Sequence, residues 1–468
     1  MQKVFDEVGS LDKRCYEEFS LSEDILMEHA AASLMQYIQS KFVSNEKILI
    51  VSGSGNNGAD GIALARLLHS RYDIYLYTPF GVSSSMAKLQ YKRAKLLGVN
   101  IIDDLASLAS EHTPNVIVDA LFGSGLNRDL NIESQKLLTL LNSLYAHKIA
   151  CDIPSGINVN GQITTTAFRA NTTITMGALK TSLYSDVAKD YVGSIIVSDL
   201  GVQRTIYETN TAMFLLDFFD MEIPFRTQQN SHKGKYGHLS VIVGEKKGAG
   251  IIAADAAFAF GAGLVTTVAH ENINPPLHIM QDHALPENCT AIAVGMGLGR
   301  YEKEEIHTLL ENNIPKVIDA DLFYDEIILN VLNKEGIVLT PHPKEFCSLL
   351  KISGLADITT DELQNNRFKY LKLFGKKYPK SVLLLKGANT LITYENCVYI
   401  NNLGSAVLSK GGSGDVLTGL VASLLTQGYS AINSAITGTL AHSIAAKNYE
   451  KNNYSLTPAD LIEGVKVL

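Results

Sequence analysis

The sequence predicts an α/β protein built from two halves. In each half, short strand-like apolar runs alternate with helical patterns, which is typical of a parallel sheet covered by helices. The first half has strand-like runs at 47–52, 73–78, 115–120 and 148–153, with helical patterns at 63–70, 86–98 and 134–144. The second half has a helical pattern at 253–263, further helices from 414 onward, and strand-like runs at 238–244, 264–269, 291–295, 316–320, 336–340 and 381–387.

The chain length and one polar segment predict the division into domains. A chain of 468 residues is long enough for two or three domains. Near residue 215 the composition changes from acidic to proline-containing and then to basic and glycine-bearing. We therefore predict one domain at 1–212 and a second at 218–468.

Charge and composition exclude several classes of partner. The net charge of −8 argues against binding to a nucleic-acid backbone. The five cysteines are scattered and include no CxxC pair, so we expect a reducing, cytoplasmic location. The N-terminus lacks the apolar region of a signal peptide, and the apolar stretch 251–269 carries Asp255 and two glycines. We interpret that stretch as a buried helix followed by a strand, and expect no membrane partner.

Three polar loops follow strands of the first half. They are GSGNNGADG at 53–61, DALFGSGLNRD at 119–129 and DIPSG at 152–156. Singly, each is compatible with a tight turn, a helix cap or a bend. Together they lie at one edge of the predicted sheet, where ligands bind. Asp119 and Asp152 would need a cation or a shared proton there, and oxygens of Asn57, Asp119 and Ser155 suit an alkali or alkaline-earth ion.

Four motifs of the second half carry candidate site residues, and two of them suggest a phosphate site. In GGSGDVLTG at 411–419, glycines precede a helix whose free N–H groups can face an anion, and Asp415 could act as a base. The alternative is a helix start capped by Ser413 or Asp415. His342, between two prolines, is either a ligand contact or structural, and Lys386 either meets phosphates or ends a strand in solvent. AVGMGLG at 293–299 is another glycine-rich segment after a strand, and by itself it is weak evidence for a site.

The ordered set GNNGADG, DALFGSGL and DIPSG resembles the epimerase domain of the bifunctional NAD(P)H-hydrate repair enzymes of YjeF type. That resemblance implies a Rossmann-like doubly wound sheet, a catalytic Asp152, and K⁺ held by Asn57, Asp119 and Ser155. The family motif has glycine where this chain has Ala59, and we expect that exchange to cost backbone freedom. The implied substrate-binding residues are Asn56, Asn57, Gly58, Ala59, Asp60, Gly123, Ser124, Gly125, Leu126, Asn127, Arg128, Asp129 and Asp152.

The second-half motifs, in order, resemble the ADP-dependent NAD(P)H-hydrate dehydratase domain, which implies a ribokinase-like α/β fold. Small departures are Met296 where proline is frequent and Ser413 where threonine is usual. The residues implied at the hydrate are Ala253, Gly297, His342 and the catalytic Asp415. The residues implied at the adenine nucleotide are Lys386, Gly387, Ala388, Asn389, Thr390 and Gly414.

The favoured hypothesis is therefore repair of hydrated NADH and NADPH, with K⁺ in the first domain and ADP with Mg²⁺ in the second. We also expect a homo-oligomer. One alternative is a ribokinase-type small-alcohol kinase fused to a nucleotide-binding regulatory domain, which would leave a stable phosphorylated product. Another is a cofactor sensor that binds without turnover, against which Asp119, Asp152 and Asp415 argue.

Overall fold

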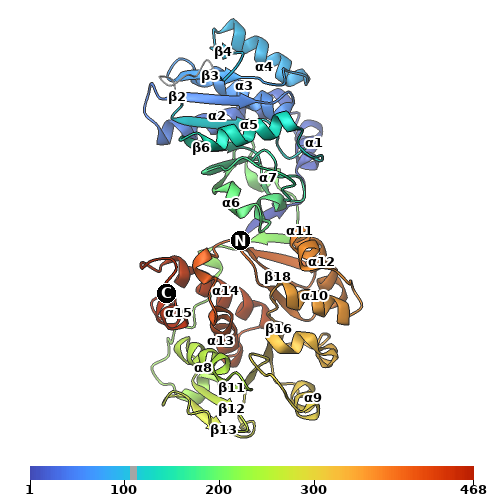
Figure 1. The fold of residues 1–468 in the computed structure, drawn as a ribbon, viewed down its shortest axis with the longest axis vertical. Coiled ribbons are helices and arrows are strands. Elements are labelled where there is room, and N and C mark those ends of the chain that lie inside the picture. Colours follow the sequence, from blue (N-terminus) through green and yellow to red (C-terminus); the bar gives the residue numbers. More distant parts are fainter. Residues whose placement is uncertain (106–112) are drawn as a thin grey trace. The chain divides into compact units, whose positions relative to one another are not determined.

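The computed structural model describes residues 1–105 and 113–468. The chain divides into two compact units, one formed by Lys3–Thr211 and the other by Ala212–Leu468 together with Met1–Gln2. Each unit is an α/β structure with its own sheet (Figure 1). The sequence predicts that the first domain ends at 212 and the second begins at 218. Strand β10 (Met213–Leu215) lies between these two limits, and the structure places it in the second unit, paired with β19 (Cys397–Asn401).

The first unit contains a seven-stranded sheet in the order β4-β3-β2-β5-β6-β7-β9, and every pair in it is parallel. The strand order reverses between β2 and β5, which is the position where open α/β sheets bind ligands. The strands are β2 (Lys47–Ser52), β3 (Asp73–Tyr77), β4 (Ile101–Ile102), β5 (Val116–Ala120), β6 (His147–Cys151), β7 (Thr172–Met176) and β9 (Ser194–Ser198).

Helices cover both faces of this sheet. One apolar cluster joins alternate strand residues to α2 (Glu23–Lys41), α3 (Asn56–Leu68) and α4 (Ser85–Leu96). The opposite set of strand residues packs against α5 (Ile132–Ser143). The remaining elements are β1 (Gln2–Phe5), which pairs with β8 (Leu179–Lys180), and the helices α1 (Gly9–Glu18), α6 (Lys189–Val192) and α7 (Arg204–Tyr207).

The second unit contains a sheet that runs from β13 to β10 in the order β13-β12-β11-β14-β15-β16-β17-β18-β19-β10. The pairs β17–β18 and β18–β19 are antiparallel, and the other pairs are parallel. The strands not yet given are β11 (His238–Ile242), β12 (Leu264–Val268), β13 (Met280–Asp282), β14 (Ala291–Val294), β15 (Lys316–Ile318), β16 (Ile337–Leu339), β17 (Val382–Leu385) and β18 (Thr390–Tyr394).

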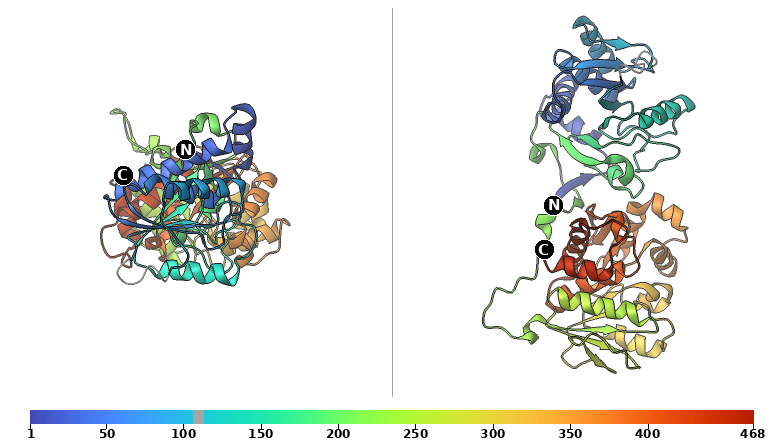
Figure 2. Two further views of the ribbon diagram at one scale, coloured as in Figure 1. Left: turned by 90° about the horizontal axis from the view of Figure 1, so that it is seen from above. Right: turned by 60° about the vertical axis from the view of Figure 1, so that its left-hand side comes forward.

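The main core of the second unit lies between this sheet and three helices, α8 (Lys247–Ala259), α13 (Ser413–Thr426) and α14 (Ala431–Lys447). A further helix, α15 (Pro458–Val465), packs on the outside of that layer (Figure 2). The other helices are α9 (Lys303–Glu311), α10 (Pro343–Ile352), α11 (Thr360–Asn365) and α12 (Arg367–Lys377).

The α/β class predicted for both halves is confirmed. The stretch 251–269 is indeed a helix followed by a strand, α8 and β12. Within the described residues, no helix combines the length and the apolar character needed to cross a membrane. Several features differ from prediction. α3 begins well before residue 63, and neither the strands β4, β7 and β9 nor the antiparallel hairpin of β18 and β19 was predicted.

Candidate active sites

A cavity of about 500 Å³ opens at the switch point between β2 and β5. Of the residues implied for the epimerase substrate, ten line it: Asn56, Asn57, Asp60, Gly123, Ser124, Gly125, Leu126, Asn127, Arg128 and Asp152. Gly58 and Ala59 are instead buried inside α3, and Asp129 is exposed outside the cavity lining. The ends of two adjacent strands thus bring most of the predicted residues together.

The glycine-rich segment after β2 is mostly helical. α3 begins at Asn56, so only residues 53–55 form a loop, whereas the sequence predicted a loop as far as Gly61. Ala59 therefore lies inside a helix and is completely buried. The expected cost in backbone freedom at Ala59 is wrong, because alanine is the best helix former.

The glycines of this segment allow α3 to approach the sheet. A Cβ added to Gly58 would lie 1.8 Å from the carbonyl oxygen of Gly53. A Cβ added to Gly61 would lie 2.5 Å from Oγ of Ser52. These contacts hold the first turn of α3 against the end of β2 and present that turn to the cavity.

Asp152 directly follows β6 and has a φ of 69°, which non-glycine residues adopt only rarely. Its N–H donates to the carbonyl oxygen of Ile174 at 2.8 Å. The carboxylate lines the cavity, where the N–H of Ser124 donates to Oδ2 at 2.9 Å. A strained residue held in this way beside a cavity is typical of a functional position.

Lys180 forms a buried ion pair with Asp152. Its Nζ lies 2.7 Å from Oδ1 of Asp152, and its side chain is 2% exposed. The ammonium also donates to Oγ1 of Thr175 at 2.8 Å and to the carbonyl oxygen of Met176 at 3.0 Å. Burial is the largest influence on the pKa of Asp152 and raises it, but Lys180 and the donated hydrogen bonds outweigh burial, and the pKa is lowered overall.

Asp119 lies behind the cavity and is held by the loop after Asp152. Ser155 donates to it through its N–H at 2.8 Å and its Oγ at 2.7 Å, and the N–H of Leu121 donates at 3.1 Å. Burial raises the pKa of Asp119 to about 6, although these hydrogen bonds lower it. The sequence predicts that Asp119 and Asp152 need a cation or a shared proton, and at Asp152 the chain itself supplies the cation, as Lys180.

The side-chain amide of Asn57 is buried, and neither Oδ1 nor Nδ2 hydrogen-bonds to any residue that the structure describes. Leaving such a group unsatisfied costs about 1–3 kcal/mol, so a water or a ligand outside the chain is expected to satisfy it. A Cβ added to Gly123 would lie 3.1 Å from Oδ1 of Asn57 and 2.9 Å from Oδ2 of Asp152. Within residues 1–105 and 113–468 no cluster of three His, Cys, Asp or Glu is suited to hold a metal ion. A cation here would be held by neutral oxygens and Asp119, hard donors that suit an alkali or alkaline-earth ion.

In the second unit, the N-terminus of α13 and Lys386 form a positively charged site. α13 begins after Gly412, whose φ of 87° suits glycine. The N–H groups of its first turn, including those of Gly414 and Asp415, have no acceptor within the helix. Nζ of Lys386 lies 3.5 Å from the position that a Cβ on Gly414 would take. An ammonium beside a helix N-terminus is well suited to bind phosphate.

Two buried charged residues fix this arrangement. Asp319, which follows β15, accepts from Nζ of Lys386 at 2.8 Å and from Oγ1 of Thr418 at 2.8 Å. Arg367 donates to the carbonyl oxygens of Lys386 at 3.0 Å and Asn389 at 2.8 Å. The predicted nucleotide segment from Lys386 to Thr390, which includes Gly387 and Ala388, is thereby tied to α12 and α13.

Asp415 lies in the first turn of α13 and is partly buried. Burial raises its pKa, Asp319 raises it further, and Lys386 opposes both. A carboxyl whose pKa moves from its usual acidic range towards neutral is better suited to accept a proton from a substrate hydroxyl.

His342 forms the N-cap of α10. Its Nδ1 accepts from the N–H groups of Lys344 at 3.1 Å and Glu345 at 3.3 Å, and its Nε2 lies 3.0 Å from Oε1 of Glu345. The imidazole is therefore fixed in position by the helix start, with 44% of its side chain exposed. A contact with hydrate at this residue would use the exposed edge of the ring.

One residue predicted at the hydrate, Ala253, lies inside the second unit. Ala253 is completely buried in α8 and faces α13, because a Cβ on Gly419 would lie 2.3 Å from its carbonyl oxygen. Ala249, one turn earlier, lies beside Gly297: its Cβ is 3.4 Å from the position of a Cβ on Gly297. Ala249 rather than Ala253 is therefore the alanine at the accessible end of α8.

Comparison with known proteins covers both units. The family profile described as YjeF-related protein N-terminus matches residues 23–182, and that described as NAD(P)H-hydrate dehydratase matches residues 239–466. The chain is 45% identical to the bifunctional NAD(P)H-hydrate repair enzyme Nnr of Helicobacter pylori, over 100% of both chains. The chain belongs to the bifunctional NAD(P)H-hydrate repair family. The resemblance drawn from the ordered motifs is confirmed.

Other members of this repair family match nearly as fully. The Coxiella burnetii enzyme is 33% identical over 96% of this chain and 96% of its own. The Dictyoglomus turgidum enzyme is 32% identical over 98% of this chain and 96% of its own. A solved ADP/ATP-dependent NAD(P)H-hydrate dehydratase from Bacillus subtilis, co-crystallised with ATP/Mg²⁺, is 25% identical and covers 51% of this chain and 91% of its own, with a TM-score of 0.43.

Four charged residues around the two sites of this repair-family member were not predicted from sequence: Asp12, Lys180, Asp319 and Arg367. Asp12 and Lys180 are far in sequence from the three loops, and Lys180 comes from a two-residue strand. The available signal was weak: Lys180 is the one charged residue in the stretch 172–184. A lone charge in such a run indicates a buried partner, because a buried charge is costly unless paired.

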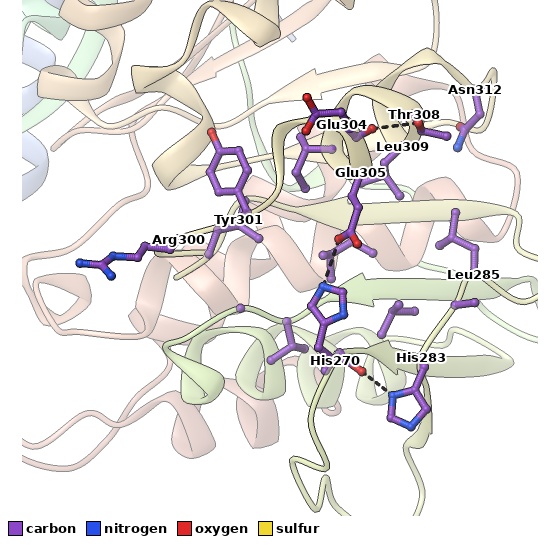
Figure 3. Close-up of a pocket in the computed structure, with 18 residues that line it drawn as sticks. His270, His283, Leu285, Arg300, Tyr301, Glu304, Glu305, Thr308, Leu309 and Asn312 are labelled. Carbon is purple, nitrogen blue, oxygen red and sulfur yellow. Dashed lines mark hydrogen bonds and ion pairs between the residues drawn. The ribbon is translucent and has the colours of Figure 1, made fainter.

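A second cavity, of about 640 Å³, lies in the second unit (Figure 3). Its walls are mainly apolar and come from the ends of β11 and β12, from the segment after β14 and from α9. At one side, Nε2 of His270 lies 3.0 Å from Oε2 of Glu305, and Nδ1 of His283 lies 2.9 Å from the carbonyl oxygen of Ala269 (Figure 3). None of the predicted dehydratase residues lines this cavity, so we do not assign it to the reaction.

Proposed function

We propose that this chain repairs hydrated NADH and NADPH. In the damaged cofactor, water has added across a double bond of the nicotinamide ring, which gives R and S epimers at the hydroxylated carbon. The unit Lys3–Thr211 interconverts the epimers, and the unit Ala212–Leu468 removes water from the S epimer while converting ADP to AMP and phosphate. The observation that carries this proposal is the 45% identity, over the full length, to the Helicobacter pylori repair enzyme.

In the first unit, Asp152 acts as the base, and Lys180 keeps it ionised through the contact at 2.7 Å. The first turn of α3 and the segment from Gly123 to Arg128 bind the hydrate, because both line the same cavity. Asn57, Asp119 and Ser155 would hold K⁺, a role supported by the unpartnered amide of Asn57 among the described residues. When bound, the ion would supply positive charge beside a substrate whose phosphates are negative.

In the second unit, Asp415 takes the proton from the substrate hydroxyl, and the oxygen attacks the terminal phosphoryl group of ADP, which is bound as its Mg²⁺ complex. The bond between that phosphorus and the bridging oxygen breaks, and AMP departs. Lys386 and the N–H groups at the start of α13 stabilise the charge on the transferred group. Phosphate then leaves from carbon with the bonding electrons, a neighbouring carbon loses a proton, and the ring double bond is restored.

Product analysis tests this proposal against a kinase. The chain is incubated with hydrated NADH, ADP and Mg²⁺, and the products are separated by chromatography. Repair predicts that NADH, AMP and inorganic phosphate accumulate in equal amounts. A stable phosphorylated hydrate without free phosphate would instead identify the chain as a kinase.

A further inference from the structure

Among the residues that the structure describes, three carboxyl groups line the cavity of the first unit. Asp12 comes from α1, Asp60 from α3 and Asp152 from the end of β6. The repair proposal uses Asp152 as a base and gives Asp60 only a place in the binding surface. Asp12 was not predicted at all.

These three carboxyl groups have different partners. Asp152 is paired with Lys180, and Asp12 accepts from the hydroxyl of Tyr207 at 2.7 Å. Asp60 receives no hydrogen bond from any residue in the described part of the chain, and no cation is paired with it there. An acid that has no internal partner and faces a cavity is free to bond to a substrate.

The surroundings of Asp60 favour its neutral form. Burial is the main reason that its pKa lies well above the ordinary value, and nearby negative charges raise it further. The titratable groups that interact with Asp60 are Asp12 and Tyr16 of α1, Glu23 of α2, Cys151 of β6 and Asp152. The cavity therefore holds one carboxyl whose pKa is lowered and another whose pKa is raised.

Inversion of the hydrate needs such a pair. Water adds to an enamine at the carbon next to nitrogen, so the hydroxyl of the hydrate shares its carbon with the ring nitrogen. The nitrogen lone pair can expel this hydroxyl and form a C=N bond, provided that an acid protonates the departing oxygen. Water must then add to the other face of that carbon and lose a proton to a base. Two groups whose pKa values are driven apart are suited to these tasks.

The geometry points to Asp60 as the acid that protonates the departing hydroxyl and to Asp152 as the base for the incoming water; this inference rests on the epimerase function proposed above. The C–O bond breaks, the proton of Asp60 leaves with the oxygen as water, and the nitrogen lone pair forms a second bond to the same carbon, so that C–N becomes C=N. Water then forms the new C–O bond, Asp152 takes its proton, and the nitrogen recovers its lone pair. Proton exchange with solvent returns both carboxyls to their starting states.

Asp60→Asn in the full chain tests this role, because it keeps the shape of the side chain and removes the acid. In K⁺ buffer we expect kcat for epimerisation to fall about 10²–10⁴-fold, with KM within a few-fold of the parent value. Dehydration of purified S epimer by the same preparation serves as the control for an intact chain. Epimerisation at the parent rate would overturn the role of Asp60. Absence of both activities in the unsubstituted chain would instead count against the proposed function.

Glu23→Gln is the matched variant. Glu23 does not line the cavity, but its charge raises the pKa of Asp60. Its Oε1 accepts from Asn56 at 2.6 Å, a bond that the carbonyl of glutamine can also accept. Because the reaction requires protonated Asp60, the rate of the parent should fall at high pH, and Glu23→Gln should move that fall to lower pH without changing the maximum. The role of Asp60 as the acid would be refuted if the rate of the parent did not fall at high pH, or if Glu23→Gln left that fall at the same pH. This test holds even if Asp60→Asn does not fold.

Discussion

At the scale of single residues, the buried pair of Lys180 and Asp152 sets the charge at the cavity of the first unit. Replacing Lys180 by methionine leaves a buried carboxylate without its partner. We expect the pKa of Asp152 to rise, so that the acid limb of the epimerisation profile moves to higher pH. Breaking a buried pair in this way also costs about 3–5 kcal/mol of stability. The measurements are the pH–rate profile and the melting temperature, and an unchanged acid limb would show that Lys180 does not keep Asp152 ionised.

The same pair sets the sign of one pH effect on stability. The pKa of Asp152 in the folded unit is below its ordinary value. Its ionised form therefore stabilises the folded unit at pH values above the pKa that this Asp has in the unfolded chain, which is about 4. That stabilisation disappears as the pH falls through the lower pKa of Asp152 in the folded unit. Lys180→Met should remove this part of the acid sensitivity of melting.

The proposed ion site gives a second prediction at this scale. Replacing K⁺ by a bulky organic cation should slow epimerisation, because the oxygens of Asn57 and Asp119 then have no ion to bind. Asp119→Ala should abolish the response to K⁺ and weaken hydrate binding. The assay follows epimer exchange by chromatography in both buffers. Equal rates in the two buffers, with Asp119→Ala changing only the melting temperature, would leave Asp119 as a purely structural residue.

The sequence predicted the cavity residues that come after β2, β5 and β6, such as Asn57, Ser124 and Asp152, because parallel strands bring their carboxyl ends to one edge. It could not identify Lys180 or Asp12. Their places at the first site depend on how β8 and α1 lie next to loops more than 25 residues away along the chain. The sequence therefore predicted most of the residues that line the cavity, but it missed the charges of Lys180 and Asp12.

At the scale of elements, the start of α3 is the feature that the sequence misplaced. Four glycines in nine residues indicate a loop, but those at 58 and 61 are required by close packing inside a helix. Only contacts with the ends of β2 and β5, which are not visible in sequence, distinguish the two cases.

Ala59→Gly tests this helical assignment. In a loop the exchange would be neutral or favourable, whereas inside α3 it should destabilise the first unit by about 1 kcal/mol. Gly55→Ala is the control, since a Cβ at that position meets nothing within 4 Å. Chemical denaturation of the unit measures both. An Ala59→Gly variant as stable as its parent would contradict a helix that begins at Asn56.

At the scale of the whole molecule, the two units have separate cores and separate sites. Cutting the chain between Thr211 and Ala212 keeps β10 with its partner β19, whereas a fragment that begins at residue 218 would lose this strand. We expect residues 3–211 to fold with only epimerase activity and residues 212–468 with only dehydratase activity. Circular dichroism and the two assays on purified fragments check this. Fragments that are soluble only when expressed together would show that the units depend on each other.

The central claim is that one chain repairs both epimers at two different sites. Its most direct test is the recovery of reduced-nicotinamide absorbance from an epimer mixture of hydrated NADH with ADP. We predict complete recovery with the unsubstituted chain and recovery of only the S fraction with Asp152→Asn. With Asp415→Asn the rate should fall about 10²–10⁴-fold for both epimers. Recovery by Asp415→Asn at the parent rate, or an R fraction that the unsubstituted chain leaves unrepaired, would contradict the account.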